Sequence, residues 1–362
     1  MQKDKLHIDK TRHRFGCGLF LAVICLCLLA SCVQNETLLP AEDNTCRVTL
    51  QLNVSSFGQQ GINGTTRSVA GYEDENLVKD IWVFQFSKQK GALLKEALYI
   101  ELSNGNTDDI EVDFDPNGGR DSSIVCVVAN THDKFWAHDA NKLTKEAFKT
   151  YEGLLEQSLP AEVSKPFRSS NMGETGGYTI PMYGESAETV IASKTYIRVP
   201  LVRMFARVHV YVDPAYPHEM NMSINKITYS NIPFYSRVKA IESSEEYPAN
   251  IWNDFEAGEA DDYVLYIPEN IQGVVDDMTD KMEAWRLQPE LFPEKALAIH
   301  IDMKQTIGEG DAAQSHFHKY KVYPGGDMKN DFNIKRNYIY NVNIKITSDP
   351  STGPSIPILP EP

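Results

Sequence analysis

The sequence has few cysteines, few basic residues relative to acidic ones, and few long apolar runs. Only six cysteines occur in 362 residues, and four of them lie in the first 32 positions, so a disulfide-rich scaffold is excluded. The formal net charge is −15, which argues against a nucleic-acid partner because phosphate binding rests on clustered Lys and Arg. After the first thirty residues no apolar run approaches the ~18 residues that a membrane-spanning helix needs.

Recognised catalytic motifs are also missing. The chain has no P-loop, no Gly-x-Gly-x-x-Gly turn after a strand, no His-Glu-x-x-His helix and no Gly-x-Ser-x-Gly elbow. We therefore predict a protein that is not an enzyme and needs no cofactor. A polysaccharide-degrading enzyme has only the abundant carboxylates in its favour, because a glycosidase needs two of them held in one cleft.

Metal-ligand patterns are weak. His300, His316 and His318 come nearest, since His316 and His318 share one face of a strand, but no Cys or carboxylate stands beside them at ligand spacing. The acidic clusters Glu73–Glu75 and Asp261–Asp262 lack the spacing of a calcium-binding loop. We expect strand histidines and solvated loop charges, and no metal site.

The N-terminus has the layout of a signal peptide, with five basic residues followed by the apolar run 15–30. That run ends in Leu29-Ala30-Ser31-Cys32, which resembles the bacterial lipobox. This motif predicts cleavage between Ser31 and Cys32, with residues 1–31 removed and Cys32 acylated. The alternative is an ordinary secretory signal with a cysteine there by chance. Two or three acyl chains would anchor the protein without spanning the membrane.

The segment 32–45 is polar and reads as a lipidated tether. Removing five basic and two acidic residues with the signal leaves 30 basic and 48 acidic residues, a net charge of −18. Cys46 and Cys126 are the two cysteines that follow Cys32. They could form one bridge in an oxidising compartment, but Cys126 lies in an apolar run and is expected to be a buried small hydrophobe.

Structure is predicted to begin with a strand over 46–54. Val48, Leu50, Leu52 and Val54 alternate with polar residues, the period-two pattern of a half-buried strand. A loop rich in Gly, Gln and Thr follows over 57–76. Further strands are predicted over 80–86, 97–102, 109–114, 123–130, 196–212, 225–232, 262–271, 295–304, 316–324 and 332–347.

Helical spacing is confined to 133–156, with a start near Thr144, and to 276–285. Residues 169–186 read as a glycine-rich loop, and Pro200 and Pro214 are expected to limit the apolar run 196–212. Many short strands with turns between them predict a mainly all-β chain of sandwiches. The 331 residues after the signal exceed the size of one usual core, so we predict two domains with a boundary near Pro200. The predicted regions are 46–200, 201–348 and a proline-rich tail, 349–362.

Four features together resemble the fimbrillin family, the lipoprotein-derived subunits of the type V pili of Bacteroidetes. They are the lipobox, TTRSVAGYEDENLVKDIWVFQF from residue 65, VPLVRMFARVHV from residue 199, and YIPENIQG from residue 266 followed by NIKRNYIYNVNIKI. Each motif alone is weak, but the four features in this order extend over essentially the whole chain.

The resemblance implies two tandem transthyretin-like antiparallel β-sandwich domains with one or two short helices in loops. It also implies an assembly mechanism, in which an arginine-specific protease cuts after the first strand and a C-terminal strand of another subunit fills the groove. Arg67 and Ser68 match the cleavage position, with Arg67 as an ordinary loop arginine the alternative. The partners would be other fimbrial subunits, self or related, and the location the cell surface with a lipid anchor in the outer membrane.

The tail departs from the pattern of a shaft subunit, because only Ile356 and Ile358 alternate and Pro357 stands between them. An anchor or tip role is therefore also open, and an anchor would keep its lipid and escape cleavage at Arg67. A further hypothesis is a monomeric surface lipoprotein that binds host glycan or protein through a loop at Tyr178–Tyr183. Exposed aromatic side chains there would support it.

Overall fold

The computed structural model describes a series of separate segments between Thr45 and Ile344. The signal, Cys32, the tether before Thr45, the Arg67–Ser68 position and the proline-rich tail lie outside the described residues. The described segments are 45–59, 73–88, 92–105, 107–116, 122–131, 149–160, 179–212, 221–247, 252–257, 263–281, 284, 288–308 and 313–344.

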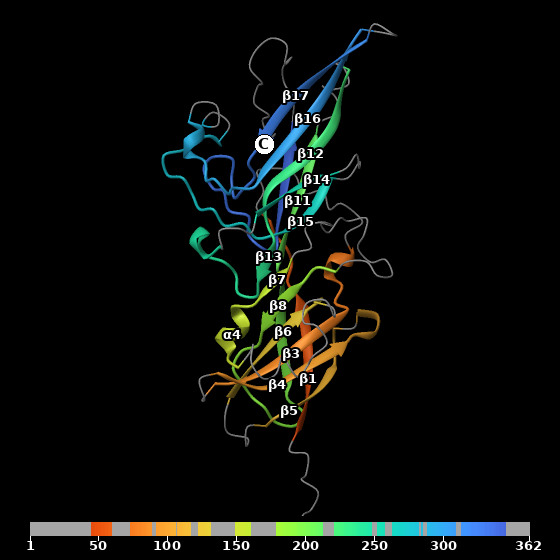
Figure 1. Cartoon of the computed structure of the whole chain (residues 1–362). Coiled ribbons are helices and arrows are strands. Elements are labelled where there is room, and N and C mark those ends of the chain that lie inside the picture. The colour runs from red at the N-terminus through yellow and green to blue at the C-terminus, as the bar shows by residue number, and fades with distance from the viewer. Residues whose placement is uncertain are drawn as a thin grey trace, which may run out of the picture. The chain divides into compact units, whose positions relative to one another are not determined.

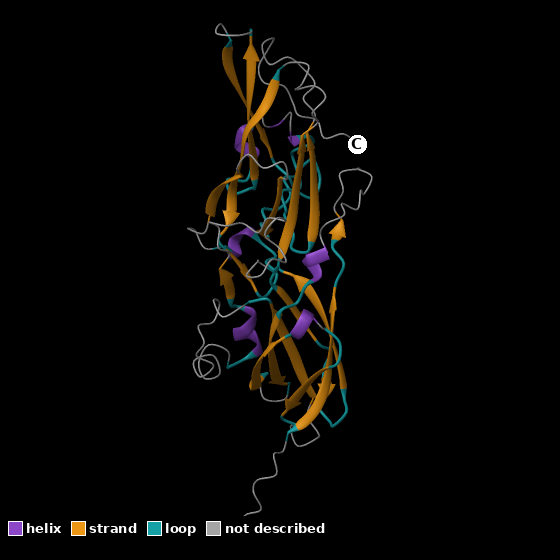
Figure 2. Ribbon diagram, turned by 90° about the vertical axis from the view of Figure 1, so that its right-hand side faces the viewer, coloured by secondary structure: helices purple, strands orange, loops and turns teal. Residues whose placement is uncertain are grey.

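The described chain is mainly β, as predicted, and its helices are short (Figures 1 and 2). No helix in the described segments is long and apolar enough to cross a membrane. The strands and the α-helix are β1 (Cys46–Val54), β2 (Gly58–Gln59), β3 (Asp80–Ser87), β4 (Leu93–Glu101), β5 (Ile110–Phe114), β6 (Ser122–Ala129), α4 (Tyr151–Leu155), β7 (Ser158–Pro160), β8 (Met182–Glu185), β9 (Thr189–Val190), β10 (Tyr196–Arg203), β11 (Phe205–Val212), β12 (Met222–Pro233), β13 (Tyr235–Arg237), β14 (Trp252–Ala257), β15 (Tyr263–Pro268), β16 (Ala298–Ile307), β17 (Gln314–Val322) and β18 (Tyr338–Ile344).

These strands form one large sheet and three smaller ones. The eight-stranded sheet has the order β4-β3-β6-β8-β10-β1-β5, with β9 also paired to β6. Two four-stranded sheets have the orders β15-β11-β18-β2 and β14-β12-β16-β17, and β13 pairs with β7. Most ladders are antiparallel, but β1–β10, β11–β18 and β18–β2 are parallel. The antiparallel pairing that the resemblance implies thus holds for most of the ladders, and the three parallel ones involve the strands nearest the two ends of the described chain.

The eight-stranded sheet is packed on both faces around β3. Ile81 and Val83 belong to one buried cluster, which also takes in side chains of β1, β5, β6 and β10. Trp82 and Phe84 point to the other face and pack with Leu154 of α4. The near-continuous apolar sequence of β3 follows from this double burial, since a strand covered on both faces does not alternate.

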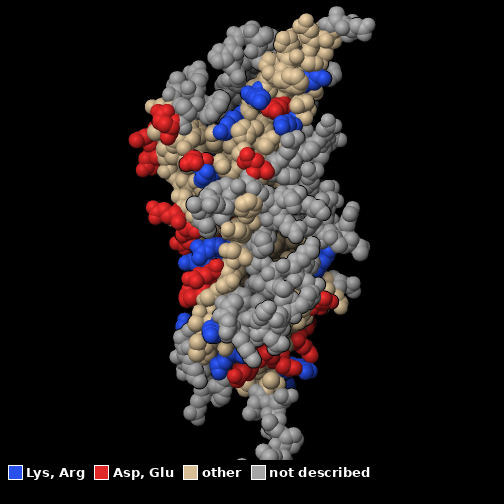
Figure 3. Space-filling view, in the orientation of Figure 1, with Lys and Arg blue, Asp and Glu red and all other residues tan. Residues whose placement is uncertain are grey.

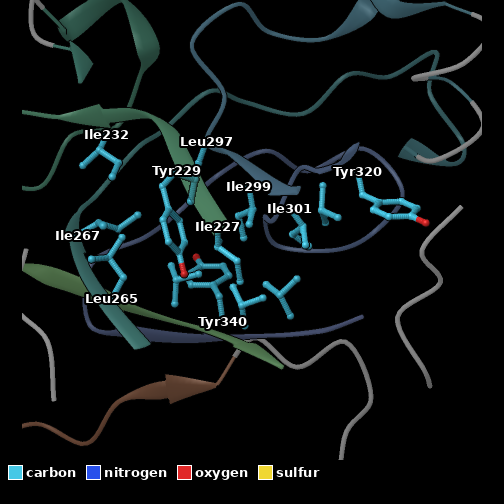
Figure 4. Packing of buried hydrophobic residues seen from close by; sticks show 14 of the residues in the cluster. Ile227, Tyr229, Ile232, Leu265, Ile267, Leu297, Ile299, Ile301, Tyr320 and Tyr340 are labelled. Atoms are coloured by element: carbon cyan, nitrogen blue, oxygen red, sulfur yellow. The ribbon is translucent and has the colours of Figure 1, made fainter. Parts of the chain in front are cut away.

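The two four-stranded sheets bury a common core. Ile227 and Ile299 come from one sheet and Leu265 and Tyr340 from the other, and Figure 4 shows these side chains pointing toward one another. This face-to-face packing is the sandwich arrangement that the strand pattern predicts. The division of the whole chain into two tandem domains stays a prediction.

The predicted strand over 196–212 is in fact two strands. β10 ends at Arg203 and β11 begins at Phe205, and the two strands belong to different sheets. Pro200 does not limit the run, because it lies inside β10. β10 pairs with β8 only from Val202 onward. Pro200 therefore lies before that ladder, where the N–H that proline lacks costs least.

Another prediction was wrong at the glycine-rich loop. Residues 182–185 of that segment form β8, an interior strand between β6 and β10. A Cβ at Gly184 would lie 2.2 Å from the carbonyl oxygen of Pro200, so glycine is needed there for close approach of two strands. The glycines suggested a loop, whereas here one of them permits dense packing.

The helical prediction over 133–156 is confirmed at its end by α4, while 132–148 lies outside the described residues. Thr150 caps this helix by accepting a hydrogen bond from the amide of Gly153. In the second predicted region, Lys281 and Ala284 are helical, and the Ala284 amide donates to the Asp280 carbonyl at 3.0 Å.

The first strand as a candidate functional site

β1 is the first described strand of the chain, yet it lies inside a sheet. It runs parallel to β10, from Thr49 opposite Tyr196 to Val54 opposite Leu201. On its other side it runs antiparallel to β5. Removal of β1 would therefore open two rows of backbone donors and acceptors at once.

β5 depends on β1 for its place in the sheet. Among the described strands, β1 alone pairs with β5. The end of β5 is held separately by the buried Gln85 side chain, whose amide donates to the Asp115 carbonyl at 2.7 Å and accepts from the Asp115 amide at 3.1 Å. One wall of the groove would thus keep an attachment to β3 in the absence of β1.

The inner face of β1 carries the four residues that the sequence singles out. Val48 and Leu50 are fully buried, Leu52 is 2% exposed and Val54 is partly buried. They pack in one cluster with β5, β10 and β3. Burying three such side chains is worth roughly 5 to 9 kcal/mol, an upper bound because an unfolded chain already buries some of this surface. Apolar contact is therefore the main attachment of β1.

The outer face of β1 makes ionic contacts in solvent. Arg47 donates to both carboxylate oxygens of Asp113, at 3.0 and 3.2 Å, and lies 3.5 Å from Glu111. This guanidinium holds the pKa of Asp113 below its ordinary value. The Arg47 side chain is 65% exposed, so these pairs fix orientation more than stability.

The chain leaves β1 through a polar junction built around Arg203. The Arg203 guanidinium donates to the carbonyls of Ser55 at 2.7 Å and Glu75 at 3.0 Å, and to Asn337 Oδ1 at 2.8 Å. It also lies over the ring of Phe57, 4.0 Å from the centroid. Burial lowers the pKa of Arg203 to about 10, which still leaves it charged at neutral pH.

Glu75 supplies the opposite charge at this junction. Its carboxylate accepts from Arg207 Nη1 at 2.9 Å and from the hydroxyl of Tyr266. Arg207 lies on β11 and Tyr266 on β15, so the turn that contains Glu75 is attached to the sheet of β11, β15 and β18. The segments on either side of residues 60–72 are therefore both fixed in place, at Ser55–Gln59 and at Glu75.

Sequence reasoning missed this junction. The available signal was the pair Arg203 and Arg207 inside the most apolar run of the chain, because a buried arginine there needs acceptors and a counter-charge. Nothing in the sequence indicates that Glu75 and Asn337, more than 250 residues apart, supply them. The remaining predicted site residues, Ser31, Cys32, Arg67 and Ser68, lie outside the described residues.

The cysteines and histidines do not form a site in the described part of the chain. Cys46 and Cys126 are both free thiols, and Cys126 is buried, as predicted. Burial raises the pKa of Cys126 to about 12, so the thiol stays protonated at neutral pH. His318 Nε2 lies 3.0 Å from Gln305 Oε1, and no group of three or more metal-ligand side chains occurs among the described residues.

The candidate binding loop at Tyr178–Tyr183 differs from the expectation. Thr179 and Met182 are buried, and Tyr183 packs on the cluster around Trp82. The Tyr183 hydroxyl donates within the fold, to Glu185 Oε2 at 2.9 Å, and its oxygen lies 3.6 Å from Cys126 Sγ. The described part of this candidate loop therefore belongs to the core, while Tyr178 lies outside the described residues.

Comparisons with known proteins relate this fold to that of solved structures. Residues 265–344, the segment from β15 to β18, match a family described as a domain of unknown function, DUF4906. No curated protein gives a significant match. One solved structure is that of a candidate cell adhesion protein from Parabacteroides distasonis. It is 14% identical, with a TM-score of 0.51 over 87% of this chain and 92% of that one.

A second solved structure is the tip fimbrial protein Mfa3 from Porphyromonas gingivalis, with a C-terminal truncation. It is also 14% identical, with a TM-score of 0.50 over 84% of this chain and 96% of that one. At this identity the likeness concerns the fold, and it extends over nearly the whole of both chains. The chain therefore shares its fold with these two proteins, which agrees with the fold that the resemblance to the fimbrillin family implies.

Proposed function

We propose that this chain is a subunit of cell-surface fimbriae, structural or accessory, that reaches the outer membrane as a lipoprotein acylated on Cys32 and keeps this lipid anchor until it is cleaved at Arg67. The observation that carries the proposal is the position of β1. It is an interior strand held by an alternating apolar face, and it is the first strand of the described residues, so one cut in the following loop would turn it into a separate segment. The fold shared with fimbrial and adhesion proteins supports the same role.

Cleavage at Arg67 would leave residues 46–59 attached by noncovalent contacts alone. The apolar face of β1, worth roughly 5 to 9 kcal/mol, would still hold the cut segment in place. An incoming strand must therefore offer equivalent side chains and take over the ladders of β10 and β5 as β1 leaves. This is strand addition at an exposed sheet edge, and it makes cleavage necessary for exchange without making it sufficient.

The geometry of the groove defines the strand that would replace β1. A donor must run parallel to β10 and antiparallel to β5. It must also carry apolar side chains at alternate positions for the sites of Val48, Leu50 and Leu52. The chain's own tail offers only Ile356 and Ile358 with Pro357 between them, and proline cannot donate to a ladder. This favours a role as acceptor for a different subunit, in an accessory, anchor or tip position.

The proposal can be tested in the native bacterium by mass spectrometry of this chain in the surface polymers. We expect fimbriae to contain this chain with a mature start at Ser68 and the Arg67→Ala variant to stay out of the polymers. Arg198→Ala, which removes another exposed arginine, is the matched control and should assemble normally. An acylated Cys32 retained in the polymer would indicate the anchor form, and a lipidated monomer in all three strains would contradict a fimbrial role.

The groove can be tested with a peptide of residues 46–56. Added in excess to the cleaved protein and its partner subunits, it should compete with the donor strand and lower the yield of polymer. A peptide with serine at the positions of Val48, Leu50 and Leu52 is the matched control, because it keeps the backbone and loses the apolar face. Equal inhibition by both peptides, or by neither, would show that β1 is not the replaceable strand.

A further inference from the structure

The outer face of the sheet β14-β12-β16-β17 gathers positive charge in an acidic chain. The strand register sets side chains of this face in rows across β12, β16 and β17. Lys226, Asp302 and Lys319 form one row, and Lys304 and Phe317 stand together in the next. Successive rows lie about 7 Å apart, and Figure 3 shows Lys and Arg side chains gathered over β16 and β17.

A third row carries His300 and Lys321. Burial and then the charge of Lys321 lower the pKa of His300, and Lys319 adds to the effect, while Asp254 and Asp302 oppose it. The imidazole is therefore neutral at pH 7. Among the described side chains of the face, four lysines thus stand against the two carboxylates of Asp254 and Asp302, in a chain whose net charge is −15.

An aromatic ring is exposed among these lysines. Phe317 is 60% exposed, lies directly opposite Lys304 in the ladder, and is two residues from Lys319 on the same face. Farther along, Lys321 Nζ stands 4.7 Å from the centroid of the Tyr323 ring. Lysines alone on an edge strand serve to prevent sheet-to-sheet pairing. A large exposed phenyl ring does not serve that purpose, since it invites contact.

We propose that the outer face of β12, β16 and β17, defined by Lys226, Lys304, Phe317, Lys319 and Lys321, binds an acidic polysaccharide. The lysines would pair with carboxylate or sulfate groups, and the Phe317 ring would stack on the apolar face of a sugar ring. This inference rests on the described side chains of one sheet and is independent of strand exchange at β1.

The charge distribution favours an acidic glycan over nucleic acid. Duplex DNA carries one negative charge per ~1.7 Å of axis, so its phosphates would extend beyond this small patch onto the acidic remainder of the protein. A polysaccharide with one or two charges per repeat places fewer anions there. Local charge complementarity of this kind directs association and is weakened by salt.

The test measures binding of the full chain, purified in detergent, to immobilised chondroitin sulfate, with neutral dextran and single-stranded DNA as alternative surfaces. We expect binding to chondroitin sulfate that falls as salt rises, and none to dextran. The double variant Lys304→Gln, Lys319→Gln should weaken binding roughly tenfold, because it removes two of the four positive charges that complement the anionic groups of the glycan. The control Lys194→Gln, Lys239→Gln removes two exposed lysines elsewhere and should leave binding unchanged.

Phe317→Thr separates stacking on a sugar from general attraction to anions, and it retains a residue suited to a strand. It should weaken chondroitin sulfate binding severalfold while thermal unfolding stays unchanged. No binding to chondroitin sulfate, or equal losses in the test and control lysine variants, would overturn the proposal. Unchanged binding by Phe317→Thr, or tighter binding to DNA than to the glycan, would also overturn it.

Discussion

β1 and β18 have the same position in two different sheets, but they are held in different ways. Each comes from near one end of the described chain, and each runs parallel to a strand of the consecutive pair β10 and β11. β1 is attached by its apolar inner face and by exposed ion pairs, and a buried cation, Arg203, holds the chain only after the strand has ended, at Ser55. The segment before β18 is fixed in place by two buried cations, Lys281 and Arg336, so we expect β18 to be harder to replace than β1.

Arg336 is the nearer of these cations to β18. It donates to Glu269 Oε2 at 2.9 Å and to the carbonyls of Arg237 at 2.6 Å and Val238 at 2.9 Å. Burial raises the pKa of Glu269, against the effect of the Arg336 charge, which lowers it. Such a pair is stabilising only while complete, because either partner alone would be a buried charge without compensation.

The largest expected effect is that of Arg336→Met, which leaves Glu269 buried without its partner. We expect the free energy of unfolding in urea to fall by about 3 to 5 kcal/mol. Arg198→Met, an exposed arginine of β10, is the matched control and should change it little. If both substitutions lower the free energy of unfolding equally, Arg336 does not fix the segment before β18, and the contrast with β1 is lost.

The next effect is at the core of β1. Leu50→Ala removes a fully buried side chain and should lower the free energy of unfolding by about 2 to 5 kcal/mol. Asn53→Ala, on the exposed face of the same strand, is the control and should have a small effect. A loss confined to Asn53→Ala would mean that polar contacts hold β1, contrary to the contact pattern.

The sequence predicts most strands because their side chains alternate or form short apolar runs. Val48, Leu50 and Leu52 show their burial directly in their spacing. The same pattern does not say which strands pair, since pairing depends on the whole topology. The insertion of β1 between β10 and β5, and the transfer of the chain between sheets at Met204, are therefore visible only in the structure.

Glycine and proline account for two wrong predictions. Gly184 looks like part of a loop and Pro200 like the end of a strand, but the two meet where β8 and β10 pack closely. Local propensity is overridden there by tertiary contact. The buried polar junction could not be predicted for another reason, because Arg203 and its partner Asn337 are distant in the sequence and no periodic pattern links them.

Lys281 gives a smaller effect that depends on pH. Its ammonium donates to the carbonyls of Asp327 at 2.7 Å and Asp331 at 2.5 Å, in the segment before β18, and burial lowers its pKa to about 8. The unfolded chain binds this proton up to about pH 10.5, so between pH 8 and 10.5 the unfolded state holds more protons. Stability from this group must therefore rise with pH in that window.

Lys281→Met isolates the contribution. The free energy of unfolding of the unmodified chain, relative to this variant, should increase by up to about 3 kcal/mol from pH 7.5 to pH 10.5. Lys329→Met, at an exposed lysine of the same segment, is the control and should show no such slope. A relative stability that falls over this range would mean that Lys281 is favourably charged where it lies, so that β18 is held more firmly still.

The smallest effect should come from Arg47→Ala at the beginning of β1. Because the Arg47 pairs with Asp113 and Glu111 lie in solvent, we expect no measurable change in the free energy of unfolding. The pKa of Asp113 should rise toward its ordinary value, which side-chain NMR titration can follow, since Arg47 is the main cause of its depression. An unchanged pKa would place the cause elsewhere on β5. A clear loss of stability would show that the outer face of β1 anchors it as firmly as Arg336 anchors β18, and β1 would then no longer be the strand that is easier to replace.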